Sequence, residues 1–140
     1  KKGIIAGAFD VIHPGYIQMF KDAKKHCNHL TVALHEDPSV ARSHKLPPVH
    51  TVEERKEILN AIKYVDDIVV YQAEETFLSY LSDYDIRFLG TDYRDGSYTG
   101  KDISIDIIWL PRDHDYSSTK LKRDIYNTVK GPAIAGLHYD

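Results

Sequence analysis

Short apolar runs alternate with segments of helical periodicity along most of this chain of 140 residues. The expected strands are 4–7, 30–34, 68–70, 86–89 and 105–110. The expected helices are about 15–27, 51–64, 76–81 and 118–129. Strands separated by helices predict a parallel sheet with helices on both faces. We therefore expect an α/β, Rossmann-like doubly wound fold with a five-stranded parallel sheet, and this fold type suggests the strand order 3-2-1-4-5.

Length and charge limit the classes of protein to consider. The length predicts one domain, which we expect over residues 1–130. Residues 131–140 are weakly patterned, and we expect them to form a C-terminal tail. The net charge of −3 gives no general attraction to nucleic acid or anionic membranes, so we expect neither as a partner. No apolar run reaches the length of a membrane span and no signal peptide is visible, so we expect a cytoplasmic protein.

The single cysteine, Cys27, excludes a disulfide within the chain and is compatible with a reducing compartment. It shares helical spacing with Ile17, Phe20 and Ala23, so we expect it to be a buried small hydrophobic residue.

The turn between the first strand and the first helix carries unusual residues. It reads Gly7-Ala8-Phe9-Asp10-Val11-Ile12-His13-Pro14-Gly15-Tyr16. Backbone N–H groups at a helix start can bind an anion. The small residues permit close approach of a phosphate, and the His13 imidazole can supply charge to it. This turn therefore predicts a phosphate site.

A second turn, Tyr116-Ser117-Ser118-Thr119, also opens a helix. In a doubly wound sheet, ligands bind at the carboxyl ends of strands where the strand order reverses. The expected order places that reversal between the first and fourth strands, so the turn that carries His13 would face the loop 90–93. Together the two turns predict nucleotidyl transfer.

Four segments in order resemble one family. They are Gly7-Ala8-Phe9-Asp10 with His13-Pro14-Gly15-Tyr16; Arg55-Lys56-Glu57-Ile58-Leu59 leading to Lys63-Tyr64-Val65-Asp66; Gly90-Thr91-Asp92-Tyr93; and Pro111-Arg112 through Ser117-Ser118-Thr119. Over about residues 3–125 the chain resembles the cytidylyltransferases of the nucleotidyltransferase superfamily, and in size and layout it resembles glycerol-3-phosphate cytidylyltransferases. The resemblance implies transfer of CMP from CTP to a phosphorylated small molecule, with release of pyrophosphate. It also implies Mg²⁺ or another divalent cation as cofactor and a homodimer.

The resemblance assigns roles to individual residues. His13 would contact the α- or β-phosphate, and the three hydroxyls of residues 117–119 would hold the β- and γ-phosphates. The catalytic residues so implied are His13, Tyr16, Arg112 and Lys45. The nucleotide-binding residues so implied are Gly7, Ala8, Phe9, Asp10, Arg55, Lys63, Asp92, Tyr116, Ser117, Ser118 and Thr119. Metal ligands are not identified.

Several of these residues have a second interpretation. His13 is otherwise a capping or core histidine, and the hydroxyls are otherwise ordinary helix caps. Lys45 is otherwise a solvated loop lysine, and Arg55 and Arg112 are otherwise partners in surface ion pairs. Asp10 would either orient the turn or hold Mg²⁺ through water.

Four departures from the family pattern bear on the activity. Ala8 replaces the usual Thr, Tyr16 replaces a second His, Lys63 replaces Arg, and residues 113–116 replace the usual Thr-Glu-Gly-Ile. A phenol donates a hydrogen bond but carries no positive charge at neutral pH. We therefore expect Tyr16 to donate a hydrogen bond to a nucleotide phosphate, with His114 as a compensating cation.

Two alternatives remain open. The first is an ATP-using adenylyltransferase of the same superfamily, such as those that make FAD or coenzyme A precursors; the Lys63-Tyr64-Val65-Asp66 segment favours CTP. The second is a nucleotide-binding protein that has lost catalysis, which the Tyr16 departure motivates. The sequence leaves the acceptor unidentified.

Overall fold

The computed structural model describes residues 1–112 and 115–130. The strands are β1 (Lys2–Gly7), β2 (His29–His35), β3 (Asp67–Tyr71), β4 (Ile86–Gly90) and β5 (Asp106–Leu110). The helices are α1 (Pro14–Lys24), α2 (Val52–Asn60), α3 (Glu74–Tyr80) and α4 (Ser118–Lys130), with short 3₁₀ turns at Leu81–Asp83 and Thr91–Tyr93.

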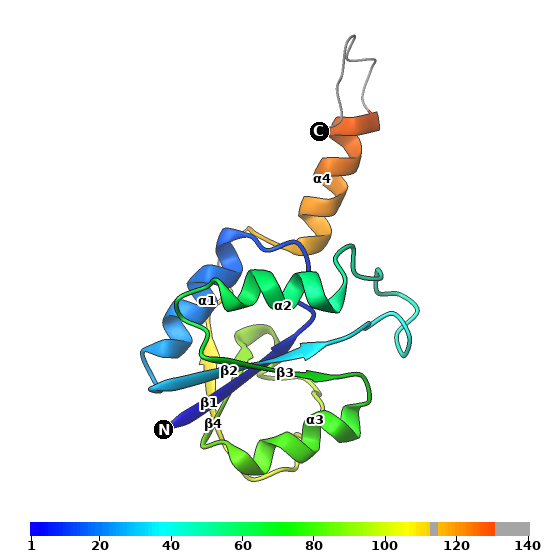
Figure 1. The fold of residues 1–140 in the computed structure, drawn as a ribbon. Helices are drawn as coiled ribbons and strands as arrows, with labels where there is room; N and C mark the ends of the chain where they lie inside the picture. Colours follow the sequence, from blue (N-terminus) through cyan, green and yellow to red (C-terminus); the bar gives the residue numbers. More distant parts are fainter. Residues whose placement is uncertain (113–114, 131–140) are drawn as a thin grey trace.

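The five strands form one sheet in the order β3-β2-β1-β4-β5, and every neighbouring pair is parallel. The predicted fold and strand order are therefore confirmed. Helices α1 and α2 cover one face of the sheet and α3 covers the other (Figure 1). The order reverses between β1 and β4, so a ligand site is expected at the carboxyl ends of these two strands.

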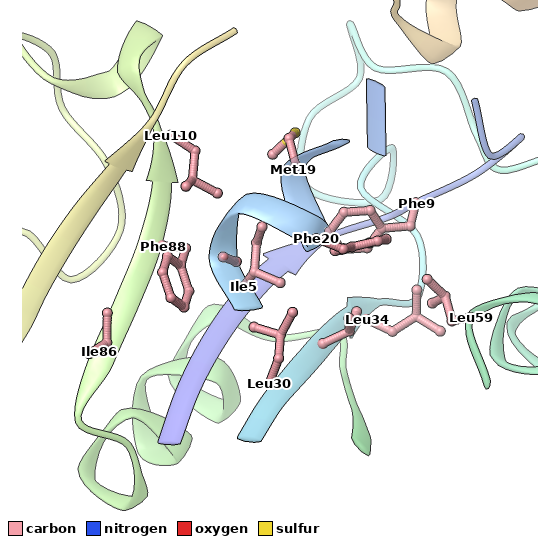
Figure 2. Close-up of a cluster of buried hydrophobic side chains, with 12 residues drawn as sticks. Ile5, Phe9, Met19, Phe20, Leu30, Leu34, Leu59, Ile86, Phe88 and Leu110 are labelled. Atoms are coloured by element: carbon pink, nitrogen blue, oxygen red, sulfur yellow. The ribbon is translucent and has the colours of Figure 1, made fainter. Parts of the chain in front are cut away.

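Side chains alternate between the two faces of the sheet. On β1, Ile5 joins the core beneath α1 and α2, where it meets Phe20, Phe88 and Leu59 (Figure 2). Its neighbour Ile4 joins a smaller cluster on the α3 face. Because successive residues of a strand point to opposite faces, a central strand buried on both faces is apolar throughout.

Local sequence explains where two helices begin. Pro14 occupies the first turn of α1, where its missing N–H leaves no intrahelical bond unmade. Thr51 and Glu54 form the predicted capping box of α2. Both helices end three to four residues earlier than predicted, although Cys27 and Ile62 still pack against the core. Cys27 is half-buried, and burial raises the pKa of its thiol.

The last helix, α4, projects away from the sheet (Figure 1). None of its residues is buried, and Ile125, Tyr126 and Val129 are about half exposed. Within the described residues no helix is both long and apolar enough to cross a membrane. The predicted tail over 131–140 lies outside the residues that the structure describes.

Candidate active site

A cavity of about 430 Å³ opens where β1 and β4 end. Its walls come from the β1–α1 turn, the loop between β2 and α2, the end of β4 and the first turn of α4. Of the predicted residues, it is lined by Gly7, Ala8, Phe9, Asp10, Tyr16, Lys45, Arg112, Ser117, Ser118 and Thr119. The two turns that the sequence singled out therefore share one cleft.

The β1–α1 turn is backbone-strained. Phe9 has a φ of 46° and Val11 a φ of 53°, both in the left-handed region. A β-branched residue such as Val11 rarely adopts this conformation, which costs on the order of 1–3 kcal/mol. Strained backbone persists only where surrounding contacts hold it in place. Asp10, which lies between Phe9 and Val11, makes such contacts.

The Asp10 carboxylate ties three segments together. It accepts hydrogen bonds from the backbone N–H of Val49 at 2.7 Å and of His50 at 3.0 Å. It also pairs with Nζ of Lys122 on α4 at 2.7 Å. Burial by itself raises the pKa of Asp10, but Lys122 and the two N–H groups outweigh burial and leave that pKa below its ordinary value. Asp10 therefore orients the turn.

Arg55 lies behind the cleft wall rather than in the cavity. It is 2% exposed, and its guanidinium donates to the carbonyls of Ala8 at 3.0 Å, His35 at 2.7 Å and Glu36 at 2.6 Å. Its Nε donates to the His50 carbonyl at 3.1 Å. These bonds fix the ends of β1 and β2 to α2, so in this structure Arg55 acts on the shape of the site.

His13 is the N-cap residue of α1 and is 5% exposed. Its ring stacks on Tyr16, with centroids 4.0 Å apart, and lies 5.8 Å from the ring of Tyr116. It lines a smaller cavity of about 240 Å³ beside the first turn of α4, together with Tyr116 and Lys120. The two predicted turns thus meet at His13, although the imidazole does not line the larger cavity.

Tyr16 and Ser118 connect α1 to α4. The Ser118 hydroxyl donates to the Asp10 carbonyl at 2.6 Å, so its single proton is used. The Tyr16 hydroxyl lies 2.8 Å from Ser118 Oγ and must be the donor of that bond. Burial raises the pKa of Tyr16, so the phenol stays protonated at neutral pH. In this structure the Tyr16 proton points to Ser118.

The first turn of α4 presents Ser117, Ser118 and Thr119 to the cavity. Ser117 caps the helix, because its Oγ accepts the N–H of Lys120 at 3.0 Å. A helix start of this kind suits a phosphate, since the helix dipole and the free N–H groups favour negative charge.

Positive charge concentrates in the larger cavity. Two lining cations, Lys45 and Arg112, were predicted from the sequence; Arg42, Arg87 and Lys122 were not. The only carboxylates that line it within residues 1–112 and 115–130 are Asp10 and Glu74. A chain of net charge −3 thus holds five cations against two carboxylates in this cleft, which favours an anionic ligand.

Arg112 lies at the rim, 3.7 Å from the Asp92 carboxylate. Both side chains crowd Gly90, where an added Cβ would come within 2.4 Å of Asp92 Oδ1 and 2.6 Å of Arg112 Cδ. The missing Cβ of Gly90 therefore leaves room for the side chains of Asp92 and Arg112.

Some predicted residues lie elsewhere. Lys63 is exposed, with its ammonium 5.3 Å from the Tyr64 ring, and does not line the cavity. Asp66 pairs with Lys24 and accepts the N–H of Leu30, so it holds α1 and β2 together. Asp92 reaches the cleft only through Arg112. His114 lies outside the described residues.

The sequence predicts Mg²⁺ as cofactor without identifying protein ligands for it. Among the residues that the structure describes, no three His, Cys, Asp or Glu side chains gather as a metal site. Both Asp10 oxygens already accept hydrogen bonds, so Asp10 does not fit as a direct ligand. Mg²⁺ commonly binds through substrate phosphates and water, and here it would arrive with the nucleotide as part of the substrate.

Comparison with known proteins identifies the family to which the chain belongs. A family model described as cytidylyltransferase-like matches residues 4–124. Glycerol-3-phosphate cytidylyltransferase of Bacillus subtilis is 32% identical over 89% of this chain and 97% of that protein. FAD synthase of Pyrococcus horikoshii is 30% identical over 97% of this chain and 79% of that protein.

A third relative is much longer. The bifunctional protein HldE of Gluconacetobacter diazotrophicus is 38% identical over 72% of this chain, which spans about a fifth of that protein's length.

Solved structures share the fold. A lipopolysaccharide core biosynthesis protein from Thermoplasma volcanium gives a TM-score of 0.65 at 22% identity, over 83% of this chain and 98% of that one. Pantothenate synthetase from Thermus thermophilus gives 0.56 at 12% identity, over 87% of this chain and 64% of that one. At these identities the likeness shows the fold alone.

Proposed function

The chain belongs to the cytidylyltransferase-like family of nucleotidyltransferases, and on that premise we propose that it transfers CMP from CTP to a phosphorylated small molecule. A phosphate oxygen of the acceptor attacks the α-phosphorus and forms the new P–O bond. The bond from the α-phosphorus to the β-phosphate oxygen breaks, and pyrophosphate leaves with that electron pair.

One observation carries the proposal: the cleft combines the cations Lys45, Arg112 and Lys122 with the serine-rich start of α4. Phosphoryl and nucleotidyl transfer need little covalent help from a protein, so positioning and charge stabilisation supply most of the rate. In this proposal the first turn of α4 holds the β- and γ-phosphates, while Lys45, Arg112 and Lys122 neutralise the charge that moves onto pyrophosphate. Mg²⁺ enters with the nucleotide.

His13 acts at the junction of the two turns in this proposal. Its stack with Tyr16 and Tyr116 fixes the plane of the imidazole beside the start of α4. A ring nitrogen would then donate to the α- or β-phosphate as pyrophosphate departs. Asp10 and Arg55 act as positioning residues, because they bond to backbone groups and to Lys122.

The nucleotide is tested directly by titration. CTP with Mg²⁺ is expected to bind more tightly than ATP in calorimetry, and pyrophosphate release is expected with CTP and a panel of phosphorylated alcohols. Equal or tighter binding of ATP would reject the cytidylyl assignment.

A second candidate is an ATP-using adenylyltransferase. The FAD synthase relative favours it, because the product in that name carries an adenylyl group. Release of pyrophosphate from ATP but not from CTP would establish this alternative. Tight nucleotide binding without turnover under any condition would instead indicate a protein that has lost catalysis.

The proposal also places the protein in the cytoplasm as a homodimer. The single cysteine is compatible with a reducing compartment and supports the location, and the resemblance to the cytidylyltransferases is the ground for the homodimer. Mass determination in solution tests the homodimer, and fractionation of the source cells tests the location.

A further inference from the structure

Arg87 on β4 is a charged residue at a buried position of the sheet, where the neighbouring side chains are mostly apolar. Its strand neighbours Ile86 and Phe88 point into the core beneath α1 and α2. By alternation Arg87 points to the α3 face, where its strand partner Ile4 lies in an apolar cluster with Tyr71 and Phe77. A charged residue at such a place calls for an explanation.

The Arg87 guanidinium is buried among aromatic rings. The residue is 5% exposed, and its Cζ lies 5.0 Å from the Phe77 ring and 5.2 Å from the Tyr98 ring. Its Nη1 donates to the Thr99 carbonyl at 2.6 Å. Within the described part of the chain no carboxylate lies within 4 Å of it. Burial lowers the pKa of Arg87, because water no longer solvates the charge fully.

The backbone around Arg87 is shaped to admit it. Gly100 has a φ of 78°, which favours glycine, and a Cβ there would come within 3.1 Å of Arg87 Nη1. The loop 97–100 therefore closes over the guanidinium and leaves it room.

His35 supplies a second polar group to the same cavity. It is 8% exposed, and its Nε2 is buried with no hydrogen-bond partner among the residues described. Its ring stacks on Tyr71 with centroids 4.6 Å apart, which fixes its plane. Burial lowers the pKa of His35, so the imidazole is neutral at pH 7. Both His35 and Arg87 line the larger cavity.

Arg87 lies away from the two turns. Arg87 pairs with Ile4, three residues before Gly7 at the end of β1. At roughly 3.3 Å per residue, its Cα lies about 10 Å along the sheet from the turn that begins at Gly7. The cations nearest the start of α4 serve the triphosphate, so Arg87 is left for another part of the substrates. His35 follows Leu34, the strand partner of Gly7, and its ring turns to the α3 face, where it stacks on Tyr71.

We propose that Arg87 and His35 form a subsite for a second anionic group of the acceptor, distal to the phosphate that attacks the nucleotide. The inference rests on the proposed function and narrows its substrate class. A buried guanidinium without a counter-ion loses solvation, and an incoming oxyanion restores it through charge-assisted hydrogen bonds. Glu74 attracts Arg87 only from beyond 4 Å, and its contact within 4 Å is with Arg42, at 3.9 Å. Acceptors with a cationic head group are disfavoured here by repulsion from Arg87.

Two three-carbon phosphates test this subsite. 3-Phosphoglycerate carries a carboxylate where glycerol 3-phosphate carries a neutral hydroxymethyl group, and the remainder is the same. We expect calorimetry to show tighter binding of 3-phosphoglycerate, and Arg87→Met to weaken it about 10- to 100-fold, as the loss of a charge-assisted hydrogen bond does. Glycerol 3-phosphate and CTP are expected to change by less than about threefold.

Two further variants control the comparison. Arg94→Met removes the same side chain at an exposed position outside the cavity and is expected to change neither acceptor. Arg87→Lys keeps the charge and is expected to retain part of the preference, and it serves in its place if Arg87→Met does not fold.

Three outcomes would overturn the inference: equal loss for both acceptors in Arg87→Met, no loss for either, or failure of 3-phosphoglycerate, phosphoenolpyruvate and a bisphosphate alike to bind the wild type. Arg87-dependent binding of the carboxylate without pyrophosphate release from any nucleotide would uphold the inference and reject the proposed function instead.

Discussion

The two ends of the cleft differ in how their polar groups are bonded. At the end formed by the two turns, Asp10, Tyr16 and Ser118 bond to one another's segments and link β1, α1 and α4. At the α3 end, His35 Nε2 has no partner within the described residues and Arg87 has no carboxylate. The first end is cross-linked by its own hydrogen bonds, whereas the second presents the buried Arg87 and His35 side chains to the cavity.

This difference separates two kinds of substitution. A change at the first end removes bonds that also stabilise the fold, so stability and activity should fall together. A change at the α3 end removes a group whose burial is unfavourable, so stability should rise while recognition is lost. The following changes test this contrast, from the largest expected effect to the smallest.

His13→Phe keeps a flat ring between Tyr16 and Tyr116 and removes both nitrogens. We expect pyrophosphate release to fall by about 1000-fold, as for the loss of a donor to developing charge. The melting temperature reports whether the stack is kept. His44→Phe, at an exposed position outside the cavity, is the matched control. Near-normal turnover in His13→Phe would remove His13 from the mechanism.

Asp10→Asn removes the charge that faces Lys122 and half of the acceptors for Val49 and His50. The free energy of unfolding is expected to fall by about 3 kcal/mol, as when one partner of a buried pair is lost. Chemical denaturation measures it, with Asp22→Asn as a surface ion-pair control of less than about 0.5 kcal/mol.

The same carboxylate predicts a pH dependence. Because the pKa of Asp10 is lowered by folding, its stabilisation is complete above its ordinary value of 3.8 and is lost as the pH falls through the lower folded value. Asp10→Asn should lack this part of the acid destabilisation. If Asp10→Asn loses stability at acid pH as the wild type does, other carboxylates account for the acid destabilisation.

Tyr16→Phe deletes the hydroxyl that donates to Ser118 and leaves the ring contacts. We expect a loss of about 1 kcal/mol in stability and about tenfold in turnover. Tyr126→Phe, on the exposed part of α4, is the control. A variant with wild-type rate and nucleotide affinity would show that Tyr16 only packs. A much larger loss of rate than of stability would support a direct contact with phosphate.

His35→Phe keeps the stack on Tyr71 and removes the buried Nε2. We expect a gain of about 1 kcal/mol in stability, since an unsatisfied buried group is removed. The pKa of His35 is lowered by burial, so the wild type loses stability as the pH falls below the ordinary value of 6.5. The variant should lose this slope, and it should bind 3-phosphoglycerate a few-fold more weakly. A loss of stability at pH 7 would instead show that His35 stabilises the fold, as Asp10 and Tyr16 do at the other end of the cleft.

The fold, and the end of the cleft formed by the two turns, were largely predictable from the sequence. The alternation of apolar runs with helical segments predicted all five strands, and the Thr51–Glu54 pattern predicted the capping box. The turn that carries His13 was expected to face the loop 90–93, and Gly7–Asp10 line one cavity with Gly90 and Tyr93, because parallel strands bring their carboxyl ends to one edge. Helix ends were less predictable, since the last turns depend on packing.

The rest of the site was not predictable because local pattern does not say what a side chain will contact. Arg55 stands in a family motif, yet in this structure it bonds to carbonyls of three separate segments. Lys122 reads as an exposed cation of an amphipathic helix, and its contact with Asp10 joins residues more than a hundred positions apart. Arg87 could have been noticed as a charge within a run of apolar strand residues.

The sequence by itself determined the order of elements, the faces of the strands and the two phosphate-type turns, because periodicity and turn chemistry are local properties of the chain. The tertiary structure decided which polar groups are satisfied. Whether Asp10 contacts Lys122, and whether a carboxylate contacts Arg87, depends on segments that only the folded sheet brings together. The cleft therefore has one end where Asp10, Tyr16 and Ser118 are bonded within the protein, and another end where we propose that Arg87 and His35 bind a ligand.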